Sequence, residues 1–429
     1  MTAARIAVID IGSNTANVAV YASAHPGHLD RVFDASEPLR LMRRLGTDGR
    51  LPDSAVERLL ETLRAFRDMA FRNGAKQVIA LATSAVRDAR NADAVARVVA
   101  QEVGVVLRVV EGAEEGRLAG IATLRLLPVR DGLVFDLGGG SLQLVELRDG
   151  RVSRAASLLL GALRLTDRFT VEAPMTADAV LTLRDHIDAE LASVPWLRDA
   201  PGPVVGVGGT VRALAKVERR RTGWRLSHGH GQLLARDAVD RTWEMVSRVD
   251  AARRRELPGL AVHRTDTIMA GALVVDRILA ARGAEHVRIN SYGVREGAAL
   301  EAWRPEQDWP DGPLQAELAG RFPGEAGPRG WARAYAALAR ADADVREEVG
   351  GGSAPLHPAL GIAAWLQASG VTGAEALAGA PTGKDRPLHG AMQESVLAAA
   401  DLLADMPLYG MSRGTHRRMR ALLGDVRAA

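Results

Sequence analysis

The chain has 429 residues, of which 47% are apolar and 25% charged, so it has the composition of a globular protein with two or three domains. A formal net charge of +3 excludes an overall polycation that binds nucleic acid indiscriminately, and the absence of cysteine excludes disulfides, thiolate metal sites and cysteine nucleophiles. The N-terminus lacks the apolar core of a signal peptide, and no segment reaches the roughly 18 apolar residues of a membrane span. We therefore expect a cytoplasmic protein with no membrane partner and no specific nucleic-acid partner.

The first 127 residues alternate between short apolar runs and amphipathic segments. The β-branched runs RIAVID and VAVY flank the turn sequence IGSNTAN and predict a β-hairpin. Helical spacing of apolar residues and a closing glycine predict a helix over 51–74. Further strands are predicted at 76–86 and 105–112, and further helices at 91–104 and 114–127. This alternation indicates an α/β domain.

The pattern begins again after Pro128. Residues 132–161 read as consecutive strands, and 203–220 as a strand, a glycine turn and a helix. The other predicted helices are 175–194, 236–249, 265–283 and one that opens at 295, and 286–291 is a predicted strand. Beyond Trp309 the sequence changes to alanine-rich segments broken by glycine and proline, which predicts an all-helical C-terminal domain.

A short pattern occurs in both halves. VIDIGSN (8–14) and VFDLGGGS (134–141) both place an aspartate inside an apolar run, followed by glycine and small residues. The two aspartates, Asp10 and Asp136, are 126 residues apart. Because each copy opens its own α/β region, the pattern favours an internal duplication.

The glycine turns are the candidate chemistry of the chain. DIGSN (10–14), DLGGGS (136–141) and GVGGT (206–210) each follow an apolar strand. Glycine lets the backbone approach a ligand closely, and successive amides in a tight turn form a concave anion site. One such turn is commonly a plain hairpin turn, but three of them predict a shared site for a phosphate chain.

These turns and several other motifs occur in the order of the exopolyphosphatase and guanosine pentaphosphate phosphohydrolase family (Ppx/GppA), which residues 5–303 resemble. The motifs are the three glycine turns together with ATSAVRDARN (82–91), VVEGAEEGRLAG (109–120), SLLLGALRLTDRF (157–169) and SYGVREG (291–297). The resemblance implies two duplicated ribonuclease-H-like domains with an interdomain cleft, over 1–127 and 128–305, with the helical domain over 310–429. It also allows a homodimer.

The resemblance implies a role for each matching position. Glu115 matches the base that orients the attacking water, and Arg87 matches a phosphate clamp. Asp10 and Asp136 match positions associated with Mg²⁺, the implied cofactor. Gln143, Arg264 and Arg295 are further candidates for the cleft. The implied phosphate-binding residues are Gly12, Ser13, Asn14, Gly138, Gly139, Gly140, Ser141, Gly208, Gly209 and Thr210.

Two positions depart from the family pattern. Gln143 stands where the family usually has glutamate, and Ser291 where it usually has aspartate. Glutamine keeps an acceptor oxygen but loses the charge that holds a hard cation.

Other polar groups have simpler interpretations. His228 and His230 suggest a metal pair, but no third ligand is near in sequence, so a loop role is favoured. The arginine triplets 219–221 and 253–255 are predicted to be solvated helix ends, with a path for a polyanion as the alternative.

The sequence therefore predicts a Mg²⁺-dependent exopolyphosphatase that releases terminal orthophosphate from inorganic polyphosphate. Three alternatives stay open at this point. One is removal of the 5′ γ-phosphate from guanosine pentaphosphate, and a second is a weakly active or inactive homologue that binds polyphosphate or a (p)ppGpp-type nucleotide. The third is a kinase-like transfer from ATP to an acceptor.

Overall fold

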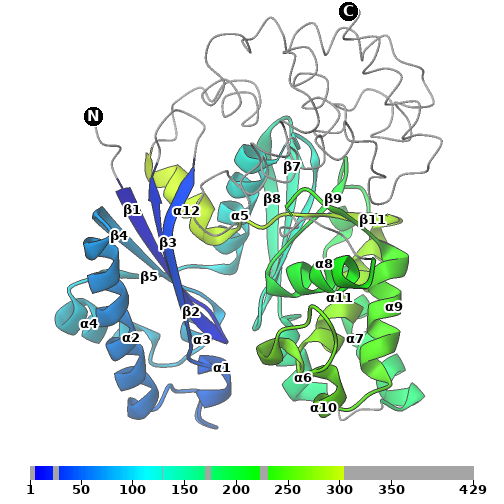
Figure 1. Cartoon of the computed structure of the whole chain (residues 1–429), viewed down its shortest axis with the longest axis horizontal. Helices are drawn as coiled ribbons and strands as arrows, with labels where there is room; N and C mark the ends of the chain where they lie inside the picture. Colours follow the sequence, from blue (N-terminus) through cyan, green and yellow to red (C-terminus); the bar gives the residue numbers. More distant parts are fainter. Residues whose placement is uncertain (1–4, 23–28, 128, 170–174, 223–229, 304–429) are drawn as a thin grey trace, which may run out of the picture.

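The computed structural model describes residues 5–22, 29–127, 129–169, 175–222 and 230–303. The predicted C-terminal helical domain, residues 310–429, and His228 lie outside the described residues. Two mixed sheets, each covered by helices, form the two halves of the molecule (Figure 1). This confirms the predicted α/β fold.

The first sheet has the strand order β3-β2-β1-β4-β5. As predicted, β1 and β2 form an antiparallel hairpin, while β4 and β5 continue the sheet in parallel. Helices α2 and α4 cover one face with a core of leucine and valine side chains. The bounds are β1 Arg5–Ile11, β2 Thr15–Ala22, β3 Asp30–Pro38, β4 Ala75–Ala82, β5 Leu107–Val109, α2 Asp53–Arg72 and α4 Ala92–Val103.

The second sheet has the order β10-β11-β9-β6-β7-β8. Strands β8-β7-β6-β9-β11 repeat the arrangement of the first sheet, because two antiparallel pairs are followed by two parallel ones. Strand β10 adds an antiparallel edge. The bounds are β6 Gly132–Leu137, β7 Leu142–Arg148, β8 Arg151–Leu158, β9 Val204–Val207, β10 Leu233–Ala235 and β11 His286–Ile289.

The repeat extends to single hydrogen bonds in the two hairpins. Asp10 lies opposite Asn17 across the first hairpin, and Asp136 lies opposite Gln143 across the second. The first turn is closed by Gly12 N–H donating to the Thr15 carbonyl at 3.1 Å. The equivalent bond in the second turn runs from Gly138 to Ser141 at 3.0 Å. The predicted echo is therefore the same structural unit in both halves, as in a duplicated ribonuclease-H-like fold.

Helices α5 (Gly112–Leu126) and α12 (Val294–Trp303) pack against each other between the two sheets and join the two halves (Figure 1). The helices pack so closely that a Cβ on Gly297 would lie 1.9 Å from the Leu118 carbonyl oxygen. Gly116 of α5 likewise lies against Val145 of β7. The apolar face of α12 packs on the first sheet in one cluster with Ile6. The chain thus returns to the first half at its last described helix.

The predicted strand 76–86 is shorter in the structure. Strand β4 ends at Ala82, and α3 (Ser84–Arg87) follows. Thr83 N–H donates to Ile11 at the sheet edge, and the Thr83 carbonyl then accepts from Arg87 N–H, which starts the helical turn. This turn carries Arg87 toward α5.

Of the remaining helices, α1 lies at the lower end of the first half in Figure 1, and the others lie against or below the second sheet. Helix α8 follows β9, and α11 packs beside α9. Within the described ranges, no helix is long and apolar enough to cross a membrane. The bounds are α1 Leu41–Arg44, α6 Ala162–Phe169, α7 Ala177–Ala192, α8 Gly209–Thr222, α9 Arg236–Ser247, α10 Ala251–Arg254, α11 Ile268–Arg282, η1 Pro195–Leu197 and η2 Val262–Arg264.

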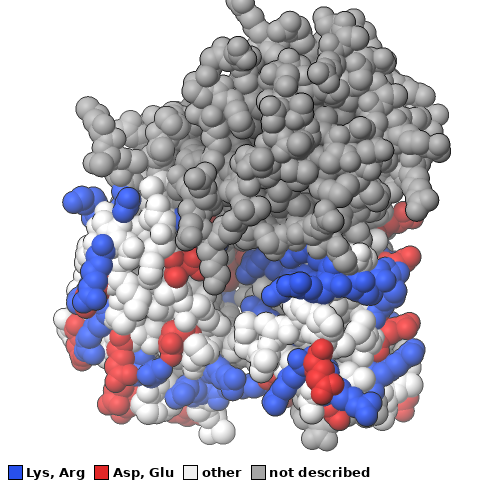
Figure 2. All heavy atoms as spheres, viewed as in Figure 1, with Lys and Arg blue, Asp and Glu red and all other residues white. Residues whose placement is uncertain are grey.

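Charge is unevenly distributed on the face shown in Figure 2. A band of basic side chains crosses the second half over α8, whose last turn holds Arg219, Arg220 and Arg221. The lower edge mixes both signs. The prediction that both arginine triplets are solvated is wrong for their buried members: Arg219 donates to Gln232 at 2.7 Å, and Arg254 donates to the Val246 carbonyl at 2.7 Å.

Candidate active site

A polar cavity of about 310 Å³ lies between the two halves. The loops around it follow β1, β6 and β9, where ligands bind in open α/β sheets because strand ends meet there. Most residues predicted from the sequence line it: Asp10, Gly12, Ser13, Asn14, Glu115, Asp136, Gly138, Gly139, Ser141, Gly208, Gly209, Arg264 and Arg295.

Four predicted residues lie behind the wall of the cavity. Arg87 contacts Glu115 from the far side, and Gln143 is fully buried beside it. Thr210 is buried against Gly271 of α11. Gly140 packs against the first half, where a Cβ would lie 2.3 Å from Ser84 Oγ. Only glycine permits this approach of the two loops.

The two matching glycine loops leave backbone donors without partners. Among the hydrogen bonds of the described residues, none is donated by the backbone N–H groups of Ser13, Asn14 and Gly139, which line the cavity. Buried amides are nearly always paired, so a cluster of free ones at a cavity fits an anion that supplies the acceptor. The two loops also approach each other, since a Cβ on Gly139 would lie 3.2 Å from Ser13 Cβ and one on Gly140 would lie 2.5 Å from Ser13 Oγ.

The third loop brings an aspartate and an arginine to the same cavity. Gly208 has φ of 104°, a left-handed value that glycine adopts without strain. A Cβ there would lie 3.0 Å from Asp136 Oδ1, and one on Gly209 would lie 1.9 Å from Arg264 Nη2. The loop is therefore shaped to hold Asp136 on one side and Arg264 on the other.

Burial raises the pKa values of Asp10 and Asp136. Burial raises the pKa of Asp10 to about 6, with the Arg295 charge opposing the shift. Burial also raises the pKa of Asp136 to about 6, with the Arg212 charge opposing it and the Asp10 charge adding to it. Carboxylates that repel each other in a buried site favour a cation between them.

Glu115 is held between a cation and an amide. It is 8% exposed, and Arg87 Nη1 donates to its Oε2 at 3.0 Å. Gln143 Nε2 donates to the same oxygen at 3.3 Å. Burial raises the pKa of Glu115 to about 8, with the Asp136 charge adding to the shift and Arg87 opposing it. A carboxylate with such a pKa accepts a proton near neutral pH, as a general base must.

Gln143 does not line the cavity and contacts three neighbouring side chains instead. Its Nε2 donates to Ser141 Oγ at 2.8 Å and to Ser157 Oγ at 3.1 Å, in addition to Glu115. Its Oε1 is buried without a partner among the described residues. The amide therefore faces Glu115 and the second loop as a donor.

Arg212 is a cavity residue that the sequence reasoning missed. It follows the third glycine loop on α8 and lines the cavity with Arg264 and Arg295. None of the three guanidinium groups has an ion-pair partner among the described residues. Burial lowers the pKa of Arg212, with the Arg295 charge adding to the shift and the Asp136 and Glu296 charges opposing it. Burial lowers the pKa of Arg264 to about 10, and the Arg212 charge adds to that shift, so a bound anion would compensate the Arg264 cation. Only its place in GGTVRALA, three residues beyond a glycine, pointed to Arg212.

His230 has a structural role, as the loop interpretation predicts. Its Nδ1 accepts from Ser291 N–H at 3.1 Å, so its Nε2 carries the proton that it donates to the Leu126 carbonyl at 2.9 Å. Burial lowers its pKa to about 4, which keeps it neutral. Ser291 itself lies at the cavity.

The donors fit a magnesium ion, although no group of three or more His, Asp or Glu side chains in the described chain forms a metal cage. Mg²⁺ is usually held by one or two carboxylates, with water and phosphate oxygens completing its shell. Asp10 and Asp136 supply two carboxylates at the cavity.

Two duplicated ribonuclease-H-like domains that enclose a polar cavity with paired glycine loops define the fold class of actin, the sugar kinases and the related chaperones. Comparison with known proteins identifies the branch. The sequence profile of the Ppx/GppA phosphatase family matches residues 20–304. The chain belongs to this family and is a phosphohydrolase.

Individual relatives agree with the family. Exopolyphosphatase 1 of Mycobacterium leprae is 34% identical over 312 residues, which cover 71% of this chain and 91% of that protein. Exopolyphosphatase 2 of Mycobacterium tuberculosis is 29% identical over 321 residues, which cover 70% of this chain and 99% of that protein. The crystal structure of the Aquifex aeolicus Ppx/GppA family member has a TM-score of 0.64 at 25% identity, covering 71% of this chain and 99% of that one.

Proposed function

We propose that the protein is a Mg²⁺-dependent exopolyphosphatase that releases orthophosphate from the end of inorganic polyphosphate. The observation that carries the proposal is the cluster of unpaired backbone amides and buried arginines that faces Glu115 across one cavity. The exopolyphosphatases among the relatives support the substrate class.

The residues at the cavity have three separate roles in the proposed phosphoryl transfer. The loop amides with Arg212 and Arg264 hold the terminal phosphoryl group and stabilise the charge that develops on its oxygens. Glu115 orients the water and accepts its proton, while Arg87 and Gln143 fix the carboxylate from behind. Asp10 and Asp136 hold the cation, which neutralises phosphate charge when it is bound.

The cavity favours polyphosphate over guanosine pentaphosphate. No Phe, Tyr or Trp lies among the described residues that line it, so it offers no broad apolar ring on which a guanine base stacks. We expect kcat/KM for polyphosphate to exceed that for guanosine pentaphosphate by at least about tenfold, or about 1.4 kcal/mol in transition-state binding. A preference for the nucleotide would overturn the substrate assignment.

The proposed cation site has its own test. Mg²⁺ binds the folded protein through Asp10 and Asp136, so it raises the melting temperature of the wild type. Asp136→Asn removes one carboxylate and shrinks that rise, while Asp88→Asn, outside the cavity, leaves it in place. Equal shifts in all three proteins would show that the ion binds elsewhere.

A further inference from the structure

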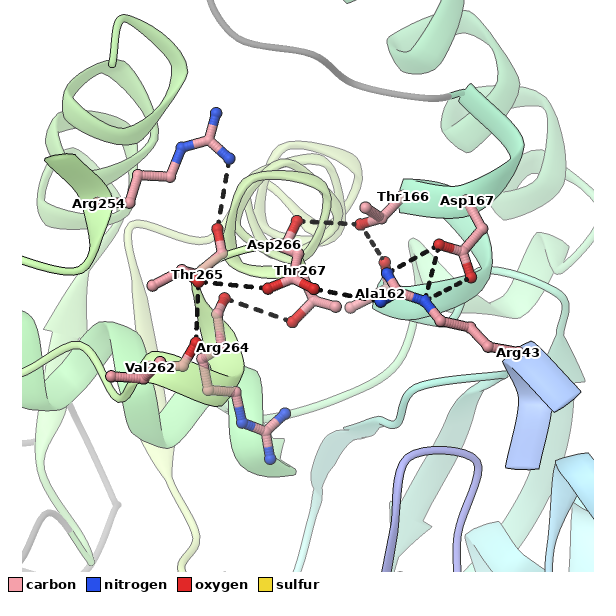
Figure 3. A network of polar contacts seen from close by, with 10 residues as sticks. All are labelled: Arg43, Ala162, Thr166, Asp167, Arg254, Val262, Arg264, Thr265, Asp266 and Thr267. Atoms are coloured by element: carbon pink, nitrogen blue, oxygen red, sulfur yellow. Dashed lines mark hydrogen bonds and ion pairs between the residues drawn. The ribbon is translucent and has the colours of Figure 1, made fainter. Parts of the chain in front are cut away.

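Two sets of ion pairs cross the cleft at the end opposite α5 and α12. Arg43 of α1 contacts Asp167 of α6 at 2.9 Å and Asp266 at 3.3 Å (Figure 3). Arg164 of α6 pairs with Asp88, the residue that follows α3. Both sets join the first half of the molecule to the second.

Among the residues that the structure describes, only the second set of ion pairs continues to Glu115. Arg164 Nε donates to the Gly140 carbonyl in the second glycine loop at 2.7 Å, while its Nη2 pairs with Asp88. Asp88 Oδ1 lies 3.7 Å from Arg87 Nε, and Arg87 Nη1 donates to Glu115 at 3.0 Å. The Arg164 side chain is 26% exposed and that of Asp88 27%, so their ion pair is partly open to water, whereas the bond from Arg164 to the Gly140 carbonyl is partly buried.

The contacts form a ring around Glu115. From Glu115 the path runs through Gln143 to Ser141, which lies in the same glycine loop as Gly140. Arg164 closes the ring between that loop and Asp88. The second glycine loop and the Glu115 side chain are thus linked by contacts that involve both halves of the molecule.

We propose that Arg164 is a positioning residue that couples closure of the cleft to the placement of Arg87 against Glu115. The inference rests on the proposed function of Glu115. When the halves separate, Asp88 loses Arg164, and Arg87 loses the fixed position of one neighbour while it keeps its bond to the Val110 carbonyl at 3.0 Å. The alignment of Arg87 on Glu115 is therefore weaker than when the halves are joined. Arg43 provides the matched control, because its ion pairs also cross the cleft but do not lead to Arg87.

Steady-state kinetics on polyphosphate with Mg²⁺ separate coupling from closure alone. Misplacing the base lowers turnover more than binding, so Arg164→Ala lowers kcat by about tenfold and changes KM by less than about twofold. Arg43→Ala changes kcat by less than about twofold. Melting temperatures of the two variants show that each is folded. An equal loss of kcat in both would overturn the proposal.

A double variant tests whether Arg164 acts through Arg87. If it does, the double variant Arg87→Ala/Arg164→Ala has the same kcat as Arg87→Ala alone. Once the Arg87 side chain is absent, Arg164 has no side chain left to position. Losses that multiply would show that the two residues act independently, and the coupling would be refuted.

Hydrogen exchange decides the proposal without turnover. Exchange of the amides of 84–88 becomes faster in Arg164→Ala and stays at the wild-type rate in Arg43→Ala, because only Arg164 holds this segment through Asp88. Equal exchange rates in the two variants would overturn the coupling, and this result does not depend on whether the wild type releases phosphate. Absence of phosphate release by the wild type would instead refute the proposed function.

Discussion

Glu115 combines burial with two donors that approach the same carboxylate oxygen. Burial and the nearby Asp136 charge favour the protonated form, whereas Arg87 favours the charged one. The balance gives the side chain a pKa of about 8, so it changes protonation close to neutral pH. A base in this range accepts a proton from water more readily than an ordinary glutamate.

The pH dependence of hydrolysis follows from this value. Only deprotonated Glu115 accepts a proton, and its pKa is raised to about 8, so kcat/KM rises with pH from 6 and levels off above about 8. Phosphate release measured between pH 6 and 9.5 at fixed Mg²⁺ checks this. A flat profile would show that the protonation of Glu115 does not control the rate.

Gln143→Glu is expected to lower activity. The new carboxylate would face Glu115 across the present 3.3 Å contact, and like charges raise the pKa of one another. A rise of one unit reduces the ionised fraction at pH 7 by about tenfold, with a matching loss of kcat/KM. Gln143→Met, which adds no charge, serves as the control. If Gln143→Glu instead increased turnover, the protein would be a homologue weakened at this position.

Much of this site was predictable from sequence, because Asp10, Glu115 and the glycine loops carry local motifs. Arg212, Arg164 and the internal position of Gln143 were not. Arg164 and Asp88 are 76 residues apart, and their contact depends on how the two halves close. The roles of the predicted residues in binding and catalysis remain predictions.

At the scale of elements, both hairpins were predictable because each alternates β-branched runs around a glycine turn. Strand β3 was missed since its sequence, DRVFDASEP, is largely polar and lies at the edge of the sheet. Helix α3 was merged with the strand before it, because ATSAV is apolar and its turn depends on Thr83 bonding to the neighbouring strand.

The contact between α5 and α12 gives a prediction at this scale. Gly297→Ala places a Cβ against the Leu118 carbonyl oxygen, which is a backbone atom and cannot move aside as a side chain can. We expect the substitution to lower the free energy of unfolding by about 3 kcal/mol. Ala302→Gly, on the exposed side of the same helix, costs only about 1 kcal/mol. Urea unfolding of both variants measures the difference. A fully stable Gly297→Ala protein would contradict the close packing.

For the whole molecule, the catalytic unit is expected to end soon after α12. The M. leprae relative aligns over 91% of its length with only 71% of this chain, and the family profile ends at residue 304. A chain that stops at residue 309 is therefore expected to retain kcat on short polyphosphate within about threefold, an effect below 1 kcal/mol. Loss of turnover in a folded truncated protein would show that residues 310–429 contribute to catalysis.

We propose that Glu115 is the base of a polyphosphate hydrolase whose active site is the cavity between the two halves of the molecule. The most direct test of this proposal is phosphate release from polyphosphate with Mg²⁺ by the wild type and by Glu115→Gln, which keeps the shape of the side chain without its basicity. We expect release by the wild type and a loss of about a hundredfold or more in kcat for the variant, with substrate binding retained. Equal rates for the two proteins would contradict it.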